Sequence, residues 1–446
     1  MKMIFLIVSI CIQGLYTYPQ PTQAKLDELL TAYSRVNKFN GTALVAQKGK
    51  ILFEKGYGLK DANRGLKNDV NTIYQIGSVT KQFTAAVILH LQEQNKLSIK
   101  DKLSKYFPDF ANGDKITIEN LLTHTSGIYN YTNDSTFMAN EISKNYTRDK
   151  MIALFKNKPL NFEPGAKWSY SNSGYSMLGY IIEKVTNKSY EQVVHEIILE
   201  PLHMNHSGFD FTHLKSTDKA IGYFVLNGNI KAVAPIVDSS VSFSAGALYS
   251  TVDDLYKWDR SIYSNTILKP ESWKTALTPY KDKYGYGWFI DTLFNKQVTM
   301  HGGGIHGFNS NMFRMPQDEI VIILLNNKGN PTLDEITKGL AAILLDQKYE
   351  IPKENVAVTV PESILQSYVG EYELAPTFKI TVRIENGNLK AQATGQPAFD
   401  LFAKSESSFF LKVVDAQVEF FKGEDGKIDH LILYQNGAKI PGKKVK

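Results

Sequence analysis

The chain has 446 residues, of which 43% are hydrophobic and 21% are charged, and it contains 24 Phe and 24 Tyr. A chain of this length divides into two or three domains, and this composition can bury a large core, which excludes a disordered protein. The 50 Lys and Arg are nearly balanced by 45 Asp and Glu, for a net charge of +5. Because nucleic-acid binders cluster basic charge and favour Arg, we expect no nucleic-acid partner.

The first 18 residues indicate a secretory signal peptide. Lys2 supplies a positive charge, the apolar run 4–12 follows it, and polar residues with Pro19 come next. Such a run is too short to cross a bilayer comfortably, and charge, apolar core and polar end are the parts of a signal peptide. The only cysteine, Cys11, lies inside this run. We therefore expect an exported protein of the bacterial periplasm or the extracellular space, with no disulfide and no stable membrane span.

The spacing of apolar residues predicts the elements of the chain in order. A helix at 24–36 precedes a hairpin of two strands at 42–47 and 51–57. A short strand at 72–76 leads into Gly77-Ser78 and a helix at 81–91. Helices are then predicted at 118–122, 149–155, 174–186 and 190–199. Beyond Pro235, strands are predicted at 285–290, 297–301, 309–313 and 320–325, followed by a helix at 333–345.

Strands thus come first, helices occupy the middle, and strands return before a last helix. This order predicts an α+β fold: an antiparallel sheet flanked by helices and built from both ends of residues 19–348, with an inserted helical subdomain. Residues 349–361 are polar and contain Pro352 and Pro361, as a linker would. Turn signals such as Asp425-Gly426-Lys427 separate strand-length runs after it, so 362–446 is predicted to be a small antiparallel barrel or sandwich.

Two copies of a Ser-x-x-Lys pattern occur, at Ser78–Lys81 and at Ser216–Lys219. The pattern alone is weak, because chance matches are expected in a chain with this much Lys. Ser78 follows a strand signal and opens an apolar helix, whereas Ser216 lies in a polar stretch. At a helix start, Ser78 and Lys81 lie one turn apart on the same face, and the helix N-terminus offers N–H groups to a developing oxyanion. Ser78 is therefore the candidate nucleophile.

Three further segments accompany Ser78. They are Leu121-Leu122-Thr123-His124-Thr125-Ser126-Gly127, Trp168-Ser169-Tyr170-Ser171-Asn172-Ser173-Gly174 and His301-Gly302-Gly303-Gly304. Together, and in this order, these motifs resemble the serine beta-lactamase and penicillin-binding protein superfamily, in its class C-like branch, over residues 25–345. The C-terminal region resembles the lipocalin-like β domain that is sometimes attached to these enzymes.

The resemblance implies a serine hydrolase that cleaves an amide or ester of a small molecule or peptide, including D-amino-acid or cell-wall-derived peptides. It implies that Ser78 is acylated, that Lys81 is its proton partner, that Tyr170 is the general base and that Asn172 binds substrate. The backbone N–H groups of Ser78 and Gly304 would form the oxyanion hole. No cofactor is implied.

A serine hydroxyl is a poor nucleophile until a positioned base removes its proton. Free Tyr and Lys are mostly protonated at neutral pH and cannot act as that base. In a desolvated groove, we expect the Lys81 cation to favour the phenolate of Tyr170, and the phenolate to hydrogen-bond Ser78.

His301, Gly302 and Gly303 stand where beta-lactamases and penicillin-binding proteins carry Lys-Thr-Gly on the strand that lines the groove. His301 and Gly303 are therefore placed among the substrate-binding residues. A histidine is largely neutral above its usual pKa of about 6.5, and glycine has no hydroxyl. We expect weak binding of a substrate carboxylate, poor beta-lactam turnover, and a preference for esters or peptides.

Other interpretations remain open at this point. A non-catalytic sensor module and a true beta-lactamase are alternative functions, and an α/β-hydrolase is an alternative fold that lacks its Gly-x-Ser-x-Gly motif here. His124 and Ser126 are expected to shape a turn, and Trp168 to lie in the core. His203 and His206 have no Glu partner at metal-binding spacing and the motif His-Glu-x-x-His is absent, so we predict no metal site.

Overall fold

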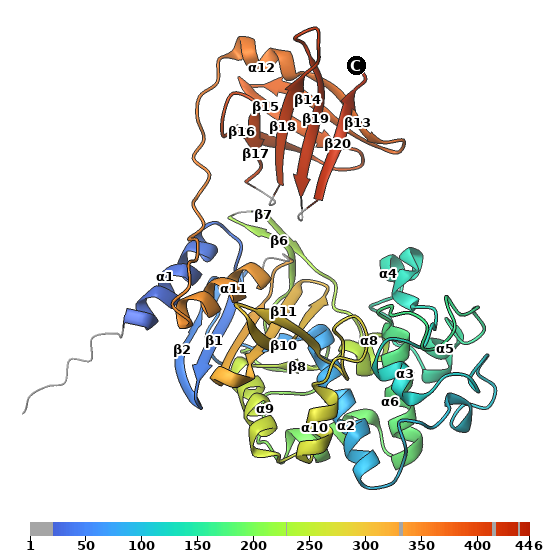
Figure 1. Cartoon of the computed structure of the whole chain (residues 1–446). Coiled ribbons are helices and arrows are strands. Elements are labelled where there is room, and N and C mark those ends of the chain that lie inside the picture. Colours follow the sequence, from blue (N-terminus) through green and yellow to red (C-terminus); the bar gives the residue numbers. More distant parts are fainter. Residues whose placement is uncertain (1–20, 229, 330–332, 413–415, 436–437) are drawn as a thin grey trace, which may run out of the picture.

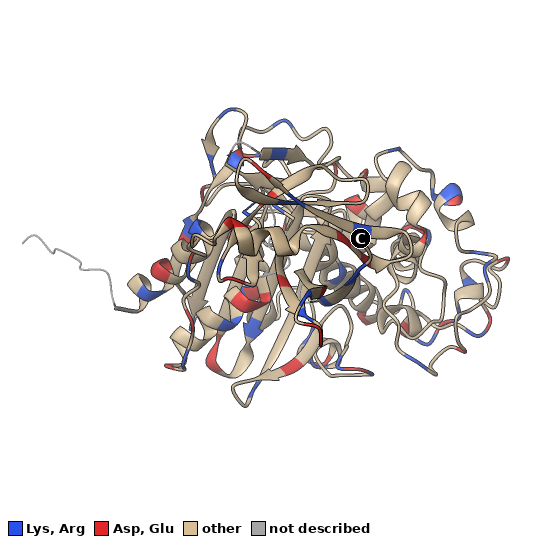
Figure 2. Ribbon diagram, turned by 90° about the horizontal axis from the view of Figure 1, so that it is seen from above, with Lys and Arg blue, Asp and Glu red and all other residues tan. Residues whose placement is uncertain are grey.

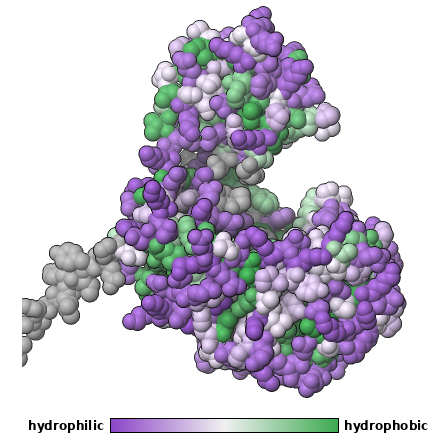
Figure 3. All heavy atoms as spheres, viewed as in Figure 1, coloured by the Kyte–Doolittle hydropathy of each residue, from purple (hydrophilic) through white to green (hydrophobic). Residues whose placement is uncertain are grey.

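The computed structural model describes residues 21–228, 230–329, 333–412, 416–435 and 438–446. The predicted signal peptide lies outside these residues. A body of sheet and helices is joined by an extended segment to a barrel at the other end of the molecule (Figure 1). The space-filling view shows the molecule hollowed between the barrel and the helical region (Figure 3). Basic and acidic residues are interspersed over the ribbon (Figure 2).

The body contains a six-stranded antiparallel sheet, as predicted. Its spatial order is β2 (Lys50–Gly56), β1 (Gly41–Gln47), β12 (Ile320–Asn326), β11 (Phe308–Met315), β10 (Lys296–Ile305) and β9 (Phe289–Leu293). The N-terminal hairpin β1–β2 thus pairs with the last strand, β12, in the register Gly41↔Asn326 to Gln47↔Ile320. Both ends of the domain contribute to one sheet.

Both faces of the central strands are buried. Successive side chains of a strand point to opposite faces of the sheet, and on each face they pack against helices. Ile320, Ile322 and Leu324 of β12 pack with helices α1 (Pro21–Arg35) and α11 (Leu333–Leu344). Val321, Ile323 and Leu325 join the larger core on the other face, which includes residues of α2 (Thr80–Glu93) and α9 (Val252–Ser264). Continuous apolar runs in these strands are the sequence signature of this two-sided burial.

The helical subdomain lies between β5 (Tyr74–Gln75) and the return of the chain to the sheet. Its helices are α3 (Ile118–Leu122), α4 (Ser135–Asn140), α5 (Arg148–Ala153), α6 (Asn172–Thr186) and α7 (Tyr190–Val194), the last continued by a π-helical turn at His195–Leu199. A hairpin, β6 (Tyr223–Asn227) and β7 (Ile230–Val233), and helices α8 (Ser239–Gly246) and α10 (Pro270–Ala276) complete the connection. Four short strands, β3 (Leu59–Asp61), β4 (Leu66–Lys67), β5 (Tyr74–Gln75) and β8 (Tyr249–Ser250), form two small ladders.

Some predicted elements differ from the observed ones. The strand predicted at 285–290 begins only at Phe289, because a turn at Gly287, with φ of +80°, precedes it. Helices α8, α9 and α10 and the hairpin β6–β7 occupy segments for which no element was predicted. The helix predicted at 81–91 is observed as Thr80–Glu93.

The C-terminal region is a closed eight-stranded barrel, which decides between the predicted barrel and sandwich. Its strands are joined in sequence order: β13 (Gly370–Ala375), β14 (Phe378–Glu385), β15 (Asn388–Ala393), β16 (Ala398–Ala403), β17 (Ser408–Phe410), β18 (Ala416–Lys422), β19 (Ile428–Gln435) and β20 (Ala438–Lys444). Pairing of Tyr372 with Lys444 closes it. Helix α12 (Glu362–Tyr368) packs Tyr368 onto Phe420, with ring centroids 4.3 Å apart. The barrel therefore has its own core.

Candidate active site

Ser78 lies in a single 3₁₀ turn, Gly77–Val79, that leads directly into α2. Gly77 has φ of +51°, a left-handed conformation that favours glycine. A Cβ at Gly77 would lie 2.9 Å from the backbone nitrogen of Gly304 on β10. The turn that carries the predicted nucleophile therefore packs closely against the strand that carries the predicted second oxyanion donor.

Lys81 is fully buried one helical turn after Ser78. Its Nζ lies 3.1 Å from Ser78 Oγ, 2.8 Å from Asn172 Oδ1 and 2.8 Å from the backbone oxygen of Ala245. No carboxylate among the described residues forms an ion pair with this amine. Burial therefore holds the pKa of Lys81 well below its usual value, because removal from water disfavours the charged form.

Tyr170 lies on the other side of the nucleophile. Its hydroxyl donates a 2.7 Å hydrogen bond to Ser78 Oγ. Burial raises the pKa of Tyr170 above its usual value of 10.0, so the side chain is a neutral phenol at neutral pH. This differs from the expected pairing of a lysine cation with a phenolate. The burial that was expected to couple the two charges instead disfavours both of them.

Asn172 is the first residue of α6, whose N-terminus is capped by Ser171. Its Oδ1 accepts the bond from Lys81, and its Nδ2 donates to Thr132 Oγ1 at 3.2 Å. The side-chain amide is thus held with a fixed orientation between Lys81 and the helical subdomain. All four residues predicted for the chemical centre, Ser78, Lys81, Tyr170 and Asn172, are brought together.

His301 and Gly303 contact other parts of the protein, whereas Gly304 lines a cavity. His301 is 2% exposed; its Nδ1 lies 2.6 Å from the oxygen of Gly302 and its Nε2 lies 3.1 Å from the hydroxyl of Tyr284. Burial lowers the pKa of His301 to about 3, so the ring is neutral at pH 7. Nδ1–H then donates to Gly302, and Nε2 accepts from Tyr284.

A Cβ at Gly303 would collide with the backbone oxygen of Ile76, so glycine lets β10 approach the strand before the nucleophile. Gly304, by contrast, lines a cavity together with Ser78 and Asn172. His301 and Gly303 do not line this cavity. Their direct contact with substrate stays a prediction, whereas their observed contacts are with the protein itself.

His124 is more closely tied to the site than the sequence indicated. Its backbone oxygen accepts from Ser169 N at 2.9 Å and its Nδ1 accepts from Ser171 N at 3.1 Å, so it holds the backbone on both sides of Tyr170. Its ring lies 4.3 Å from that of Tyr170, centroid to centroid. The residue does form a turn, with φ of +59°, and that turn also positions Tyr170.

Trp168 is half-buried rather than in the core, and packs its ring edge-on against His124 at 6.1 Å. The second Ser-x-x-Lys copy does not form a site. Ser216 Oγ accepts from Asp218 N, and Lys219 Nζ donates to the backbone oxygen of Thr212. The two side chains of that copy thus have other partners.

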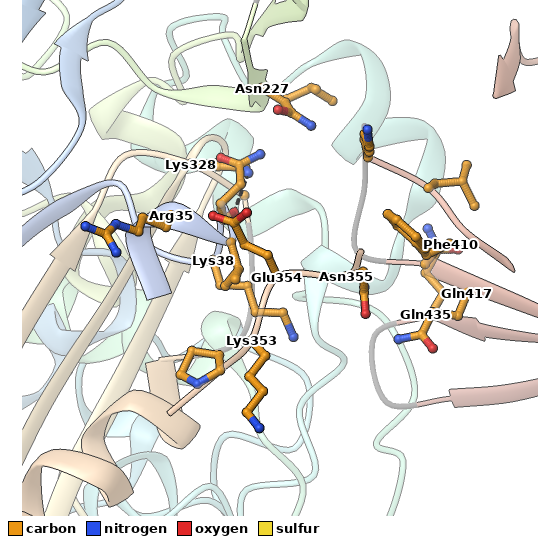
Figure 4. Close-up of a pocket in the computed structure, with 18 of the residues that line it drawn as sticks. Arg35, Lys38, Asn227, Lys328, Lys353, Glu354, Asn355, Phe410, Gln417 and Gln435 are labelled. Carbon is orange, nitrogen blue, oxygen red and sulfur yellow. Dashed lines mark hydrogen bonds between the residues drawn. The ribbon is translucent and has the colours of Figure 1, made fainter. Parts of the chain in front are cut away.

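The cavity beside Ser78 has a volume of about 410 Å³, within the range of small-molecule sites. A second cavity, of about 530 Å³, lies between the body, the linker and the barrel (Figure 4). Its labelled side chains include Arg35, Lys38 and Lys353, and it contains none of the residues around Ser78. Of these two cavities, only the first is lined by a nucleophile, Ser78, whose hydroxyl contacts groups that can move its proton.

The described part of the chain holds no cluster of three or more His, Cys, Asp and Glu residues suited to a metal ion. In the same part of the chain, no helix has the length and hydropathy needed to cross a membrane.

Residues 354–444 match a family model described as a domain of unknown function, DUF3471. The predicted likeness of the barrel to lipocalin-like domains is not confirmed by this match.

Penicillin-binding protein 4* of Bacillus subtilis (strain 168) is 29% identical to this chain, covering 94% of it and 98% of the relative. The structure of the octameric penicillin-binding protein homologue from Pyrococcus abyssi is 26% identical, with a TM-score of 0.65 over 94% of this chain and 99% of that one. A D-stereospecific amidohydrolase from Streptomyces sp. is 26% identical, with a TM-score of 0.61 over 69% and 95% of the two chains. The family model described as Beta-lactamase matches residues 26–347, so this chain belongs to that family.

Proposed function

We propose that the protein is a serine hydrolase that cleaves an amide or ester through an acyl-enzyme on Ser78. The observation that carries this proposal is the position of Ser78 Oγ, 3.1 Å from the Lys81 amine and 2.7 Å from the Tyr170 hydroxyl, in the wall of a cavity. A hydroxyl between a proton acceptor and a proton donor is arranged for nucleophilic attack.

Lys81 is the general base in this proposal. A neutral amine has two N–H donors and one lone pair, and the carbonyl oxygens of Asn172 and Ala245 use both donors. The lone pair is left for the proton of Ser78. As Ser78 Oγ attacks the substrate carbonyl carbon, its proton moves to Lys81 Nζ, and the new ammonium ion has a third donor for the oxygen of Ser78.

Tyr170 is the general acid that protonates the leaving group in this proposal. As the carbonyl carbon–nitrogen or carbon–oxygen bond breaks, the phenol gives its proton to the departing atom, and the proton held by Lys81 restores the phenol. The backbone N–H groups of Ser78 and Gly304 are the proposed oxyanion donors. Water repeats the sequence in the second half-reaction, in which Lys81 takes a proton from water and Ser78 regains its own.

The preferred substrates in this proposal are esters or peptides rather than beta-lactams. His301 is neutral, with both ring nitrogens bonded within the protein, so it supplies no positive charge for a substrate carboxylate. The similarity to a D-stereospecific amidohydrolase agrees with amide cleavage. The proposed location is outside the cytoplasm, as the first 18 residues suggest.

The test is labelling by a fluorescent fluorophosphonate, with the modified residue located by mass spectrometry. We expect label on Ser78 in the wild type, none in Ser78→Ala, and unchanged labelling in Ser216→Ala, the matched serine of the second motif. A panel of acyl esters, D-aminoacyl amides and a chromogenic cephalosporin then defines the substrate. No label on Ser78 would favour a sensor module, and cephalosporin turnover far above ester and amide turnover would indicate a beta-lactamase.

A further inference from the structure

The cavity beside Ser78 is lined mainly by apolar side chains. Its walls are formed by apolar side chains from the helical subdomain, from α8 and the segment before it, and from β11, among them Met138, Ile142, Val237, Val241 and Phe308. Ser78, Asn172 and Gly304 form the end where the chemistry takes place. No Asp, Glu, Lys or Arg occurs among the described residues that line it.

The nearest ionisable groups add no charge to this cavity. Lys81 is covered, with 0% exposure, and its burial favours the neutral amine. His306 lines the cavity, and burial lowers its pKa below the usual value. The contrast with the cavity of Figure 4 is clear, because that cavity is lined by Arg35 and four Lys residues with a single acidic residue, Glu354.

The position of Tyr170 indicates which part of a substrate enters. Its hydroxyl contacts Ser78 Oγ, but the residue does not line the cavity. The group that Tyr170 protonates must leave on the Tyr170 side of Ser78. The cavity, on the side without Tyr170, is then left for the acyl group that stays on the serine.

We propose that this cavity is an acyl pocket selective for uncharged, apolar acyl chains. The proposal rests on the proposed serine hydrolase function and adds its substrate class. A charged group that entered would lose its water without meeting a partner of opposite charge, which is strongly unfavourable. An alkyl chain would instead exchange water for Met138, Ile142 and Val241, and each buried methylene is favourable.

The hairpin β6–β7 extends this apolar surface to the outside. Phe224 of β6 lines the cavity and is 45% exposed, and Ile230 and Val233 of β7 are 43% and 53% exposed. Gly307 at the cavity packs closely against Ala234, the residue that follows β7. A longer acyl chain that fills the cavity can therefore reach the exposed ring of Phe224 on this hairpin.

The experiment compares nitrophenyl esters that share a leaving group. Pentanoyl and succinyl esters have acyl chains of similar length, but the succinyl chain ends in a carboxylate. We expect kcat/KM for the pentanoyl ester to exceed that for the succinyl ester on the order of 100-fold or more. From acetyl to butyryl to octanoyl, kcat/KM should rise by about fourfold for each methylene group that enters the cavity.

Met138→Lys places a cation of similar length in the half-buried wall of the cavity. We expect this variant to lower the pentanoyl-to-succinyl ratio at least tenfold, while the control Val356→Lys, on an exposed residue that does not line the cavity, leaves the ratio unchanged. The ratio of kcat/KM for the pentanoyl ester to that for the succinyl ester does not depend on the fraction of the variant that folds. Equal or faster turnover of the succinyl ester by the wild type, or an unchanged ratio in Met138→Lys, would overturn the acyl pocket. Failure of the fluorophosphonate to label Ser78 would instead overturn the serine hydrolase function itself.

Discussion

Replacing Lys81 with Met and, separately, Tyr170 with Phe distinguishes the two groups that contact Ser78 Oγ. Lys81→Met keeps the length of the side chain but removes the proton acceptor 3.1 Å from Oγ. Loss of a general base costs about 10²- to 10⁴-fold, and this loss should be the same for every substrate because every substrate requires the proton of Ser78 to be removed.

Tyr170→Phe should behave differently with different leaving groups. With a nitrophenyl ester, whose leaving group departs as a stable anion, the variant loses only the 2.7 Å hydrogen bond to Ser78 Oγ. One such bond contributes about 0.5–1.5 kcal/mol, so acylation should slow by roughly two- to tenfold. With an amide, whose nitrogen must be protonated as it leaves, the loss should reach about 10²- to 10⁴-fold.

The assay is single-turnover acylation with a matched pair of substrates, a nitrophenyl ester and an amide of the same acyl group. Tyr106→Phe is the control for Tyr170, because its hydroxyl bonds to Asp101 away from the site, and Lys219→Met is the control for Lys81. Both controls should leave acylation unchanged. If Tyr170→Phe slows acylation by the nitrophenyl ester as much as Lys81→Met does, Tyr170 is the base and the assignment to Lys81 is wrong.

Three other predictions concern stability and domain organisation. The pKa of His301 falls from 6.5 to about 3 on folding, so the free energy of unfolding should decrease by up to about 5 kcal/mol as pH drops from 6.5 towards 3; His301→Gln should flatten this dependence in denaturant titrations, and an unchanged slope would contradict it. Arg314→Met should cost up to about 3–5 kcal/mol, because it removes the buried partner 2.6 Å from the carboxylate of Asp259 and leaves only Arg260, at 3.7 Å, to pair with it. Thermal unfolding that does not change would refute this. A chain that ends at residue 348 should still label at Ser78 but turn over large substrates differently, since the barrel has its own core; failure of that chain to fold would show that the boundary is misplaced.

The sheet and the chemical centre were predictable because their signals are local. The turn at Lys48-Gly49-Lys50 predicts the first hairpin. The strand and Gly77 before Ser78, and the apolar helix after it, distinguish Ser78 from Ser216 as the candidate nucleophile. The turn sequence Asn227-Gly228 of the hairpin β6–β7 and the helical spacing of Leu255, Trp258 and Ile262 in α9 are equally local. These two signals therefore indicate a hairpin and a helix in segments for which the other patterns predict no element.

Other parts of the site leave no trace in the sequence. The backbone oxygen of Ala245 reaches Lys81 because α8 is kinked at Phe243, whose φ is 37°. No residue type announces that kink. The protonation states of Lys81 and Tyr170 depend on how far each side chain is removed from water. That is a property of the assembled fold, so the sequence alone favours the charged pair.

The pairing of β1 with β12 sets the order in which the domain can assemble. Asn40 N and Asn326 Oδ1 are joined by a 2.8 Å hydrogen bond although 286 positions separate the two residues. Closing so long a loop is slow, and such non-local contacts delay the folding transition. The first hairpin therefore cannot pair with β12 until nearly the whole domain has left the ribosome. The sheet therefore stays incomplete until almost the whole domain has been synthesised.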